Sequence, residues 1–241
     1  MKKTTRYILL TFLLGVLFAS CEKDNLPGPD AKVYGSITDK ATGQLVETEL
    51  VNGSSIEAYE LGFATQQLRR WLIKNNGEYR NNLVFSGRYD FKLLNCNFYP
   101  VNLTNVEIRP GDNQLDFQVE PYLRIKNPSI TYNAAAKKVT ATFTVEAGNA
   151  AVKLRQVRLY AFSDMYVGEN VKFAITGSSL VNYSPSKVVD NGTITLELDV
   201  AANAGLMPAG REYFFRIGAL GDVTGVGTVR HNFAPYVKIT I

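Results

Sequence analysis

The chain has 241 residues, of which 46% are hydrophobic, and it carries a formal net charge of +4. This length suits two domains of roughly 100 residues that each bury a core. The basic residues are scattered and lack the Lys/Arg clusters with interleaved aromatics that nucleic-acid binders use, so we expect no nucleic acid as a partner. Two cysteines and one histidine leave little material for a metal site, and we expect no metal and no cofactor.

Residues 1–20 have the three parts of a secretory signal peptide. Three basic residues lie within the first six, residues 8–18 are almost entirely apolar, and small residues follow. The apolar run is shorter than the roughly 20 residues that span a bilayer. We therefore interpret residues 1–20 as a signal peptide that is removed from the mature protein.

Cys21 directly follows the predicted cleavage point. Small residues before a cysteine match the pattern of bacterial lipoproteins, in which acyl chains are attached to the cysteine thiol and to the freed amine. Several acyl chains on one residue would hold a protein stably on a membrane. An ordinary signal peptide with an incidental cysteine is the alternative. We predict that Cys21 is lipidated and that residues 21–30 form a flexible linker.

From residue 31 onward, apolar and polar residues alternate within short runs that end in turn residues, which is typical of antiparallel β-sheets. We expect a turn at 110–113 and a boundary where Pro121 interrupts the last strand, which gives a first domain of residues 31–121. The clearest strands are predicted at 32–38, 55–59, 68–74, 87–93, 101–108 and 114–119.

Residues 122–241 show the same kind of alternation and form the second predicted domain. Asn191-Gly192 is a strong signal for a β-hairpin. Tyr213, just after the turn around Gly210, is expected to be a core tyrosine near a corner of the sandwich. The clearest strands are predicted at 138–146, around 157–161, at 193–200, at 211–217 and at 237–241.

No residue pattern points to catalysis, so we do not expect an enzyme. If Cys21 is lipidated, Cys96 has no partner within the chain, and we predict a buried free thiol and no disulfide. His231 has no signalled partner for acid–base work and is interpreted as a solvated or satisfied histidine. Because Asp and Glu residues are scattered through both halves, a hydrolase with paired carboxylates stays open as the least favoured alternative.

Two segments carry a resemblance to known modules. Val33-Tyr34-Gly35-Ser36-Ile37-Thr38-Asp39, followed by Thr42-Gly43, resembles the opening of a carboxypeptidase regulatory-like (prealbumin-like) β-sandwich. Residues 206–217 resemble the turn and strand of fibronectin type III and other immunoglobulin-like sandwiches. With the lipoprotein signal, these modules resemble a family of two-domain surface lipoproteins of Bacteroidetes. The expected fold class is all-β, with two antiparallel β-sandwich domains in tandem.

The same resemblance bears on location and function. Glu22-Lys23-Asp24 resembles the tag that sends Bacteroidetes lipoproteins to the outer face of the outer membrane, with the periplasmic face as the alternative. Family members resemble accessory proteins of starch-utilisation-type glycan-uptake loci. The resemblance implies a non-enzymatic protein that binds a polysaccharide or a partner protein such as an outer-membrane transporter. A structural or adhesive cell-surface component, such as a fimbrial subunit or spacer, is the alternative.

Four aromatic residues are candidate ligand contacts, because sugar rings stack on exposed aromatic faces. Trp71 shares a strand face with Ile73, so core packing is the main alternative for it. Tyr166 lies in a predicted surface loop, and loops commonly carry binding groups. The four candidates are Trp71, Tyr59, Tyr99 and Tyr166.

Overall fold

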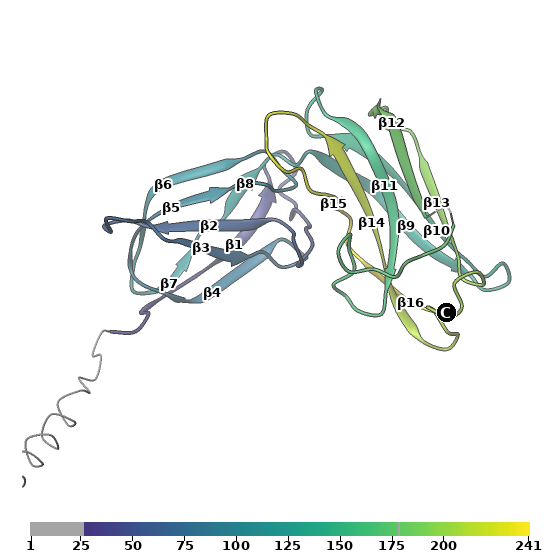
Figure 1. Cartoon of the computed structure of the whole chain (residues 1–241), viewed down its shortest axis with the longest axis horizontal. Coiled ribbons are helices and arrows are strands. Elements are labelled where there is room, and N and C mark those ends of the chain that lie inside the picture. The colour runs from purple at the N-terminus through teal and green to yellow at the C-terminus, as the bar shows by residue number, and fades with distance from the viewer. Residues whose placement is uncertain (1–26, 178) are drawn as a thin grey trace, which may run out of the picture.

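The computed structural model describes residues 27–177 and 179–241. The predicted signal peptide and Cys21 lie outside the described residues. Every regular element that is described is a β-strand, and the strands form two sandwich domains next to each other (Figure 1). The predicted all-β class with two tandem sandwiches is therefore confirmed. Within those two ranges, no element is a helix long and apolar enough to cross a membrane.

The N-terminal domain consists of eight strands in two facing sheets. The strands are β1 (Ala31–Asp39), β2 (Ser55–Glu60), β3 (Leu68–Leu72), β4 (Glu78–Val84), β5 (Gly87–Leu93), β6 (Val101–Ile108), β7 (Gly111–Gln114) and β8 (Phe117–Val119). One sheet has the order β4-β1-β7, with β8 also on β1, and the other has the order β3-β2-β5-β6. Alternate residues of β5 are buried between them, as the sequence pattern predicts.

Strand β1 pairs antiparallel with β4, as predicted, but its pairing on the other side departs from the prediction. Its first half pairs with β7 and its second half with β8, and both pairings are parallel. The expectation of a turn at 110–113 followed by one strand at 114–119 is therefore wrong. Between the two short strands, the Asp116 carboxylate accepts hydrogen bonds from Ser36 N and Oγ, each at 2.8 Å. The close approach requires Gly35, because a Cβ there would lie 2.0 Å from the Leu115 carbonyl oxygen.

The C-terminal domain also consists of eight strands in two sheets. The strands are β9 (Leu123–Asn133), β10 (Lys138–Ala147), β11 (Lys153–Phe162), β12 (Leu180–Val188), β13 (Ile194–Asp199), β14 (Glu212–Asp222), β15 (Asn232–Phe233) and β16 (Val237–Thr240). One sheet has the order β13-β10-β9, and the other has the order β12-β11-β14-β15 with β16 also paired to β14.

The connection at Asn191-Gly192 is not the predicted hairpin. It joins β12 to β13, which belong to different sheets, and β13 pairs with β10 instead. Asn191 adopts a positive φ of 55° but Gly192 does not have a positive φ, so the type I′ turn that an Asn-Gly pair favours does not form. The strand partner is set by the buried face of β13, where Leu196 and Leu198 enter the core. A turn signal alone cannot predict which strand β13 pairs with.

Tyr213 is buried in the core of the C-terminal domain, as predicted. Its hydroxyl group donates a hydrogen bond to the Pro208 carbonyl oxygen at 3.0 Å. This bond fastens the turn before β14 to the strand, which is the geometry of a tyrosine corner. The ring packs beside Phe215 and Met207, which are also buried.

Arg216 of β14 connects the two domains from a fully buried position, with 0% of its surface exposed. Its guanidinium donates hydrogen bonds to two acceptors of its own domain, the Ala234 and Val167 carbonyl oxygens. On the N-terminal domain it reaches three more, the Thr48 carbonyl oxygen at 2.8 Å, the Asn75 carbonyl oxygen at 3.1 Å and the Glu47 carboxylate. Five acceptors therefore satisfy the guanidinium at the junction.

Further polar contacts surround this buried cation. Asn97, also with 0% exposure, donates from its side chain to the backbone oxygens of Glu47 and His231. Asn232 donates to the Asn97 carbonyl oxygen at 2.8 Å. These bonds connect β15 and the residue before it to the N-terminal domain.

A second ion pair crosses the junction at another place. Arg124 of β9 makes two hydrogen bonds to the carboxylate of Asp39 at the end of β1. Burial alone would raise the pKa of Asp39, but the bonds from Arg124 and from the Ala41 backbone hold it below its usual value. Both side chains are largely buried, so bidentate geometry is needed to offset their desolvation.

His231 lies at the same junction as a neutral side chain. Its Nε2 atom donates to Gln156 Oε1 at 2.9 Å, and its ring meets Tyr160 edge-on. Burial lowers the pKa of His231 to about 4. The interpretation of His231 as a satisfied histidine is confirmed by these contacts.

Replacing Arg216 with Ala should destabilise the protein strongly, because Glu47 and several backbone oxygens would stay buried without their donor. We expect a loss of about 3–5 kcal/mol in the free energy of unfolding, measured by urea denaturation. Lys138→Ala is the control, since that lysine forms an exposed ion pair with Glu197 and should matter little. A loss below about 1 kcal/mol in the Arg216 variant would contradict the proposed dependence on this cation.

The neutral state of His231 predicts a pH dependence of stability. Between about pH 6.5 and 4 the unfolded chain binds a proton that the folded chain does not, so the free energy of unfolding falls as the pH falls. The loss should approach about 3 kcal/mol. Urea denaturation of the wild type and of His231→Gln across this range isolates the effect. Parallel pH curves for the two proteins would contradict it.

Candidate functional site

Trp71 lies in the core of the N-terminal domain rather than on its surface. Only 7% of the side chain is exposed, and its ring meets Phe91 edge-on at a centroid distance of 5.3 Å. Tyr79 packs against the same indole. Trp71 therefore has the core-packing role that was the main alternative to ligand contact. Its ring offers no open face to a sugar.

Tyr59 and Tyr99 lie in two other places. Tyr59 is half-buried on the outer face of the sheet, where Lys92 sits over its ring at 4.9 Å and its hydroxyl donates to Glu57. Tyr99 packs edge-on against the buried Tyr122 at 5.0 Å, close to the domain boundary. Both rings are already engaged by neighbours, and neither of them lines the groove described next.

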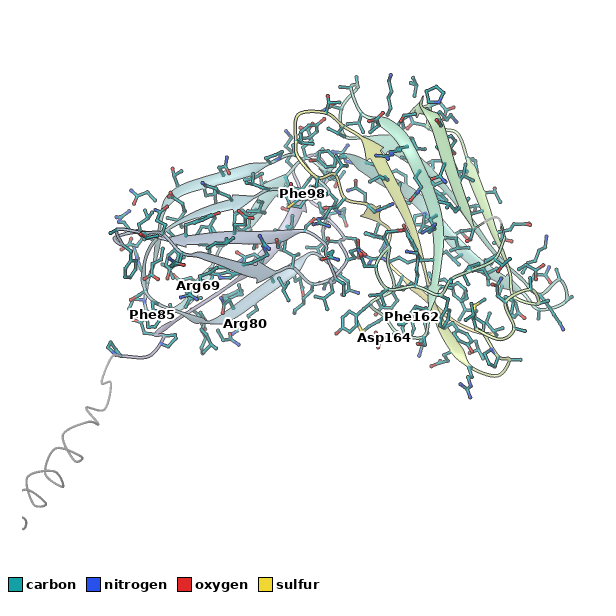
Figure 2. All side chains as sticks on the ribbon, in the orientation of Figure 1. Arg69, Arg80, Phe85, Phe98, Phe162 and Asp164 are labelled. Carbon is teal, nitrogen blue, oxygen red and sulfur yellow. The ribbon has the colours of Figure 1, made fainter. Side chains whose placement is uncertain are left out.

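Tyr166 is the candidate that the structure leaves exposed, with 41% of its side chain accessible. It belongs to the loop after β11, where the Asp164 carboxylate accepts a hydrogen bond from the Tyr166 backbone at 3.1 Å. Asn75 of the other domain donates to the Met165 carbonyl oxygen at 3.2 Å. The loop is therefore fixed to the N-terminal domain, and Figure 2 shows Asp164 on the side that faces that domain.

A groove of about 580 Å³ lies between the domains beside this loop. We call it the tyrosine groove. Tyr236 also lines it, and the Tyr236 ring is supported edge-on by Phe214 at 5.4 Å. The lining consists of Glu47, Leu50, Lys74, Asn75 and Asn76 from the N-terminal domain and Met165, Tyr166, Pro235 and Tyr236 from the C-terminal domain.

The polar groups of the tyrosine groove have both signs of charge. Lys74 lies at the rim, 3.7 Å from Glu78, and both are well exposed. Glu47 lies deeper and pairs with Arg216. Burial raises the pKa of the Glu47 carboxyl, and its pairing with Arg216 opposes that rise. An open groove with aromatic faces, an amide, an ammonium and a carboxylate suits a polar ligand with an apolar face.

A second hollow of about 500 Å³ lies on the other side of Glu47 and Pro235. The Arg124–Asp39 pair lies in its wall, and much of the remaining lining is aliphatic. Phe233 borders it but is only 7% exposed. Without an accessible aromatic face, this hollow fits a sugar ring less well than the tyrosine groove does.

The groups most suited to catalysis are occupied in structural roles. The Glu49 carboxylate accepts a hydrogen bond from the Asn170 backbone at 2.9 Å, and Glu47 is paired with Arg216. Cys96 is a buried free thiol, as predicted, and burial raises its pKa to about 11. Within residues 27–177 and 179–241, no three His, Cys, Asp or Glu residues are grouped to hold a metal ion.

Sequence reasoning found Tyr166 but missed its partners in the tyrosine groove. Tyr236 and the Asn75-Asn76 turn belong to different domains and line one groove only because the domains pack together. The sequence signal for the turn was visible, because Asn76-Gly77 marks it. Tyr236 follows Pro235 before the last strand, and only this aromatic residue in a turn could have drawn attention to it.

Two family models match the chain. Residues 31–120 match the "Protein of unknown function (DUF3823) N-terminal domain", and residues 123–238 match the "Domain of unknown function (DUF3823_C)". The two unmatched residues between them, 121 and 122, lie between the end of β8 at Val119 and the start of β9 at Leu123. No protein with a curated description matches the chain.

Solved structures share the two-domain architecture. A Bacteroides uniformis protein, provisionally named a carbohydrate binding protein, is 46% identical with a TM-score of 0.85, covering 89% of this chain and 100% of that chain. DUF3823 family proteins from Bacteroides uniformis and Parabacteroides merdae are 20% and 18% identical, both with a TM-score of 0.69. The matches cover 88% and 89% of this chain, respectively, and 100% of each of those two chains.

The two family models, in the expected order, and the 46% identity over most of the chain agree with one another. The two-domain family with Bacteroides relatives that the sequence motifs resemble is thereby confirmed. The chain belongs to the DUF3823 family.

Proposed function

We propose that this protein binds a glycan in the tyrosine groove while it is anchored through Cys21 at the outer face of the outer membrane. The observation that carries the proposal is Tyr166, an exposed aromatic side chain held over a groove that both domains build. The relative that is 46% identical and provisionally named a carbohydrate binding protein supports the same class of ligand.

The chemistry of the tyrosine groove fits a saccharide. The C–H groups on one face of a sugar ring pack against an aromatic ring, while its hydroxyl groups need donors and acceptors at the edge. Tyr166 and Tyr236 offer the rings, and Asn76, Lys74 and Glu47 offer the polar groups. A tyrosine loses little conformational entropy on binding, because it has only two side-chain torsions.

The proposed role of such binding is to hold a polysaccharide near an outer-membrane transporter that imports it. The protein would act without turning over its ligand, as an accessory component of a glycan-uptake system. A lipid anchor at Cys21 would restrict it to the membrane surface and raise its concentration beside such a transporter. If the groove instead held a partner protein, the adhesive or structural role named above would gain support.

Titration of the protein with plant, host and microbial glycans by calorimetry should give a saturable signal for one glycan class. Tyr166→Ala should weaken that binding about tenfold or more, because it removes the most accessible ring of the groove. Tyr236→Ala should weaken it as well, because it removes the second aromatic ring of the groove. Tyr59→Ala is the matched control, since it deletes a tyrosine outside the groove and should leave the affinity unchanged.

Either of two results would count against this proposal. One is the absence of a binding signal for every glycan in the panel, although circular dichroism shows that the protein is folded. The other is a loss of affinity in Tyr59→Ala but not in Tyr166→Ala, which would move the site to the outer face of the N-terminal sheet.

The proposed anchor has its own test in cells. Cys21→Ala should release the protein from the membrane fraction, because it removes the thiol to which we propose that the lipid is attached. Protease added to intact cells should degrade the wild-type protein if it faces outward. A Cys21→Ala protein that stays membrane-bound would contradict the anchor. A wild-type protein that resists the protease until the cells are lysed would contradict the outward orientation.

A further inference from the structure

One end of the N-terminal domain carries exposed apolar side chains where solvated residues would be expected. We call this end the apolar tip. Phe63 is 63% exposed, Leu83 is 77% exposed, and Leu68 and Phe85 are 44% and 45% exposed. Single exposed apolar residues are ordinary, but several at one end of a domain mark a contact surface.

The strand register places these residues at the same end. Ala31, the first residue of β1, pairs with Val84, so Leu83 and Phe85 lie where β1 begins. The end of β2 lies there too, because Glu60 pairs with Tyr89 near the start of β5. The β2–β3 connection that carries Phe63 and the start of β3 therefore belong to this end. Figure 1 shows it turned away from the C-terminal domain.

The chain enters the domain at the apolar tip. The Asp30 carboxylate accepts hydrogen bonds from the Ser86 backbone at 2.7 Å and from the Ser86 hydroxyl at 2.8 Å. The Asp30 carbonyl oxygen accepts another from Gly111 at 2.8 Å. Asp30 is thus fastened beside Phe85, and Figure 2 shows Phe85 next to the point where the chain enters.

The predicted lipid anchor lies a short chain length from this point. From Cys21 to Asp30 the extended backbone reaches about 31 Å at most. A flexible coil of that number of residues would span about 17 Å on average. An acylated Cys21 would therefore keep the apolar tip close to the membrane surface, at a high effective concentration.

Charge does not explain the exposed residues of the apolar tip. Charged groups of both signs lie nearby, as in the Arg109–Glu107 pair at 3.3 Å and the Lys32–Asp112 pair at 3.9 Å. Among the described residues of the apolar tip, basic side chains are accompanied by acidic ones, so contact with lipid would depend on apolar burial.

We propose that the apolar tip rests in the boundary between headgroups and acyl chains of the membrane that holds Cys21. Phe63, Leu83 and Phe85 would enter this boundary, while Asp30 and Ser86 keep the tether beside them. The lipid anchor supplies the affinity and the apolar tip fixes the orientation, with the tyrosine groove held a domain away from the membrane. The inference depends on the proposed anchor and not on glycan binding.

The test uses the full-length, acylated protein in vesicles of phosphatidylethanolamine and phosphatidylglycerol. A fluorophore is attached at Phe85→Cys or, as the matched control, at Val188→Cys, which is 69% exposed on the C-terminal domain. Cys96 is buried and an acylated Cys21 has no thiol, so each variant offers one reactive site. Nitroxides on the acyl chains should quench the label at position 85 at least about twice as strongly as the label at 188.

Adding Phe63→Ser and Leu83→Ser to the Phe85→Cys protein should reduce that quenching, because less apolar surface remains to enter the membrane. Equal quenching at positions 85 and 188 would overturn the proposal, and so would an N-terminal peptide whose mass shows no acylation of Cys21. Titration of the same vesicles with glycan tests the tyrosine groove separately, because its outcome depends on Tyr166 and not on the apolar tip.

Discussion

A buried positive charge holds the two sandwiches in one arrangement. Removing a guanidinium from water is costly, and Arg216 offsets that cost only where five acceptors from both domains converge on it. A rotation of one domain against the other would leave some of those acceptors, such as the Glu47 carboxylate, without their hydrogen-bond donor. The geometry of the junction is therefore specified by hydrogen-bond directions, which are far more selective than apolar contact.

Because the junction is fixed, the grooves between the domains also have a fixed shape. The loop with Tyr166 is fixed by Asn75, and the same Asn75 gives its carbonyl oxygen to Arg216. One residue of the N-terminal domain thus supports both the junction and the wall of the tyrosine groove. A site built in this way exists before any ligand arrives, so binding would not have to order a loop first. Recognition would then depend on how well a ligand fits the existing shape.

Local features of this fold could be predicted from the sequence, and distant pairings could not. The alternation of apolar and polar residues predicted the buried faces of β5 and β10. The turn before β14 predicted the position of Tyr213 at a corner of the sandwich. The parallel pairing of β1 with β7 was missed, because it joins segments about 80 residues apart and has no local signature. The tyrosine groove was only half visible for the same reason, since Tyr166 stood in a recognisable loop but its partners come from another domain.

The state of Cys96 has a consequence for how the protein matures. Among the described residues it is the sole cysteine, it is free, and burial keeps it in the unreactive thiol form. The two cores are closed by packing and hydrogen bonds, without a covalent cross-link in that part of the chain. Folding of this part of the chain would need no oxidising enzyme, and its stability should not depend on whether its surroundings are oxidising or reducing.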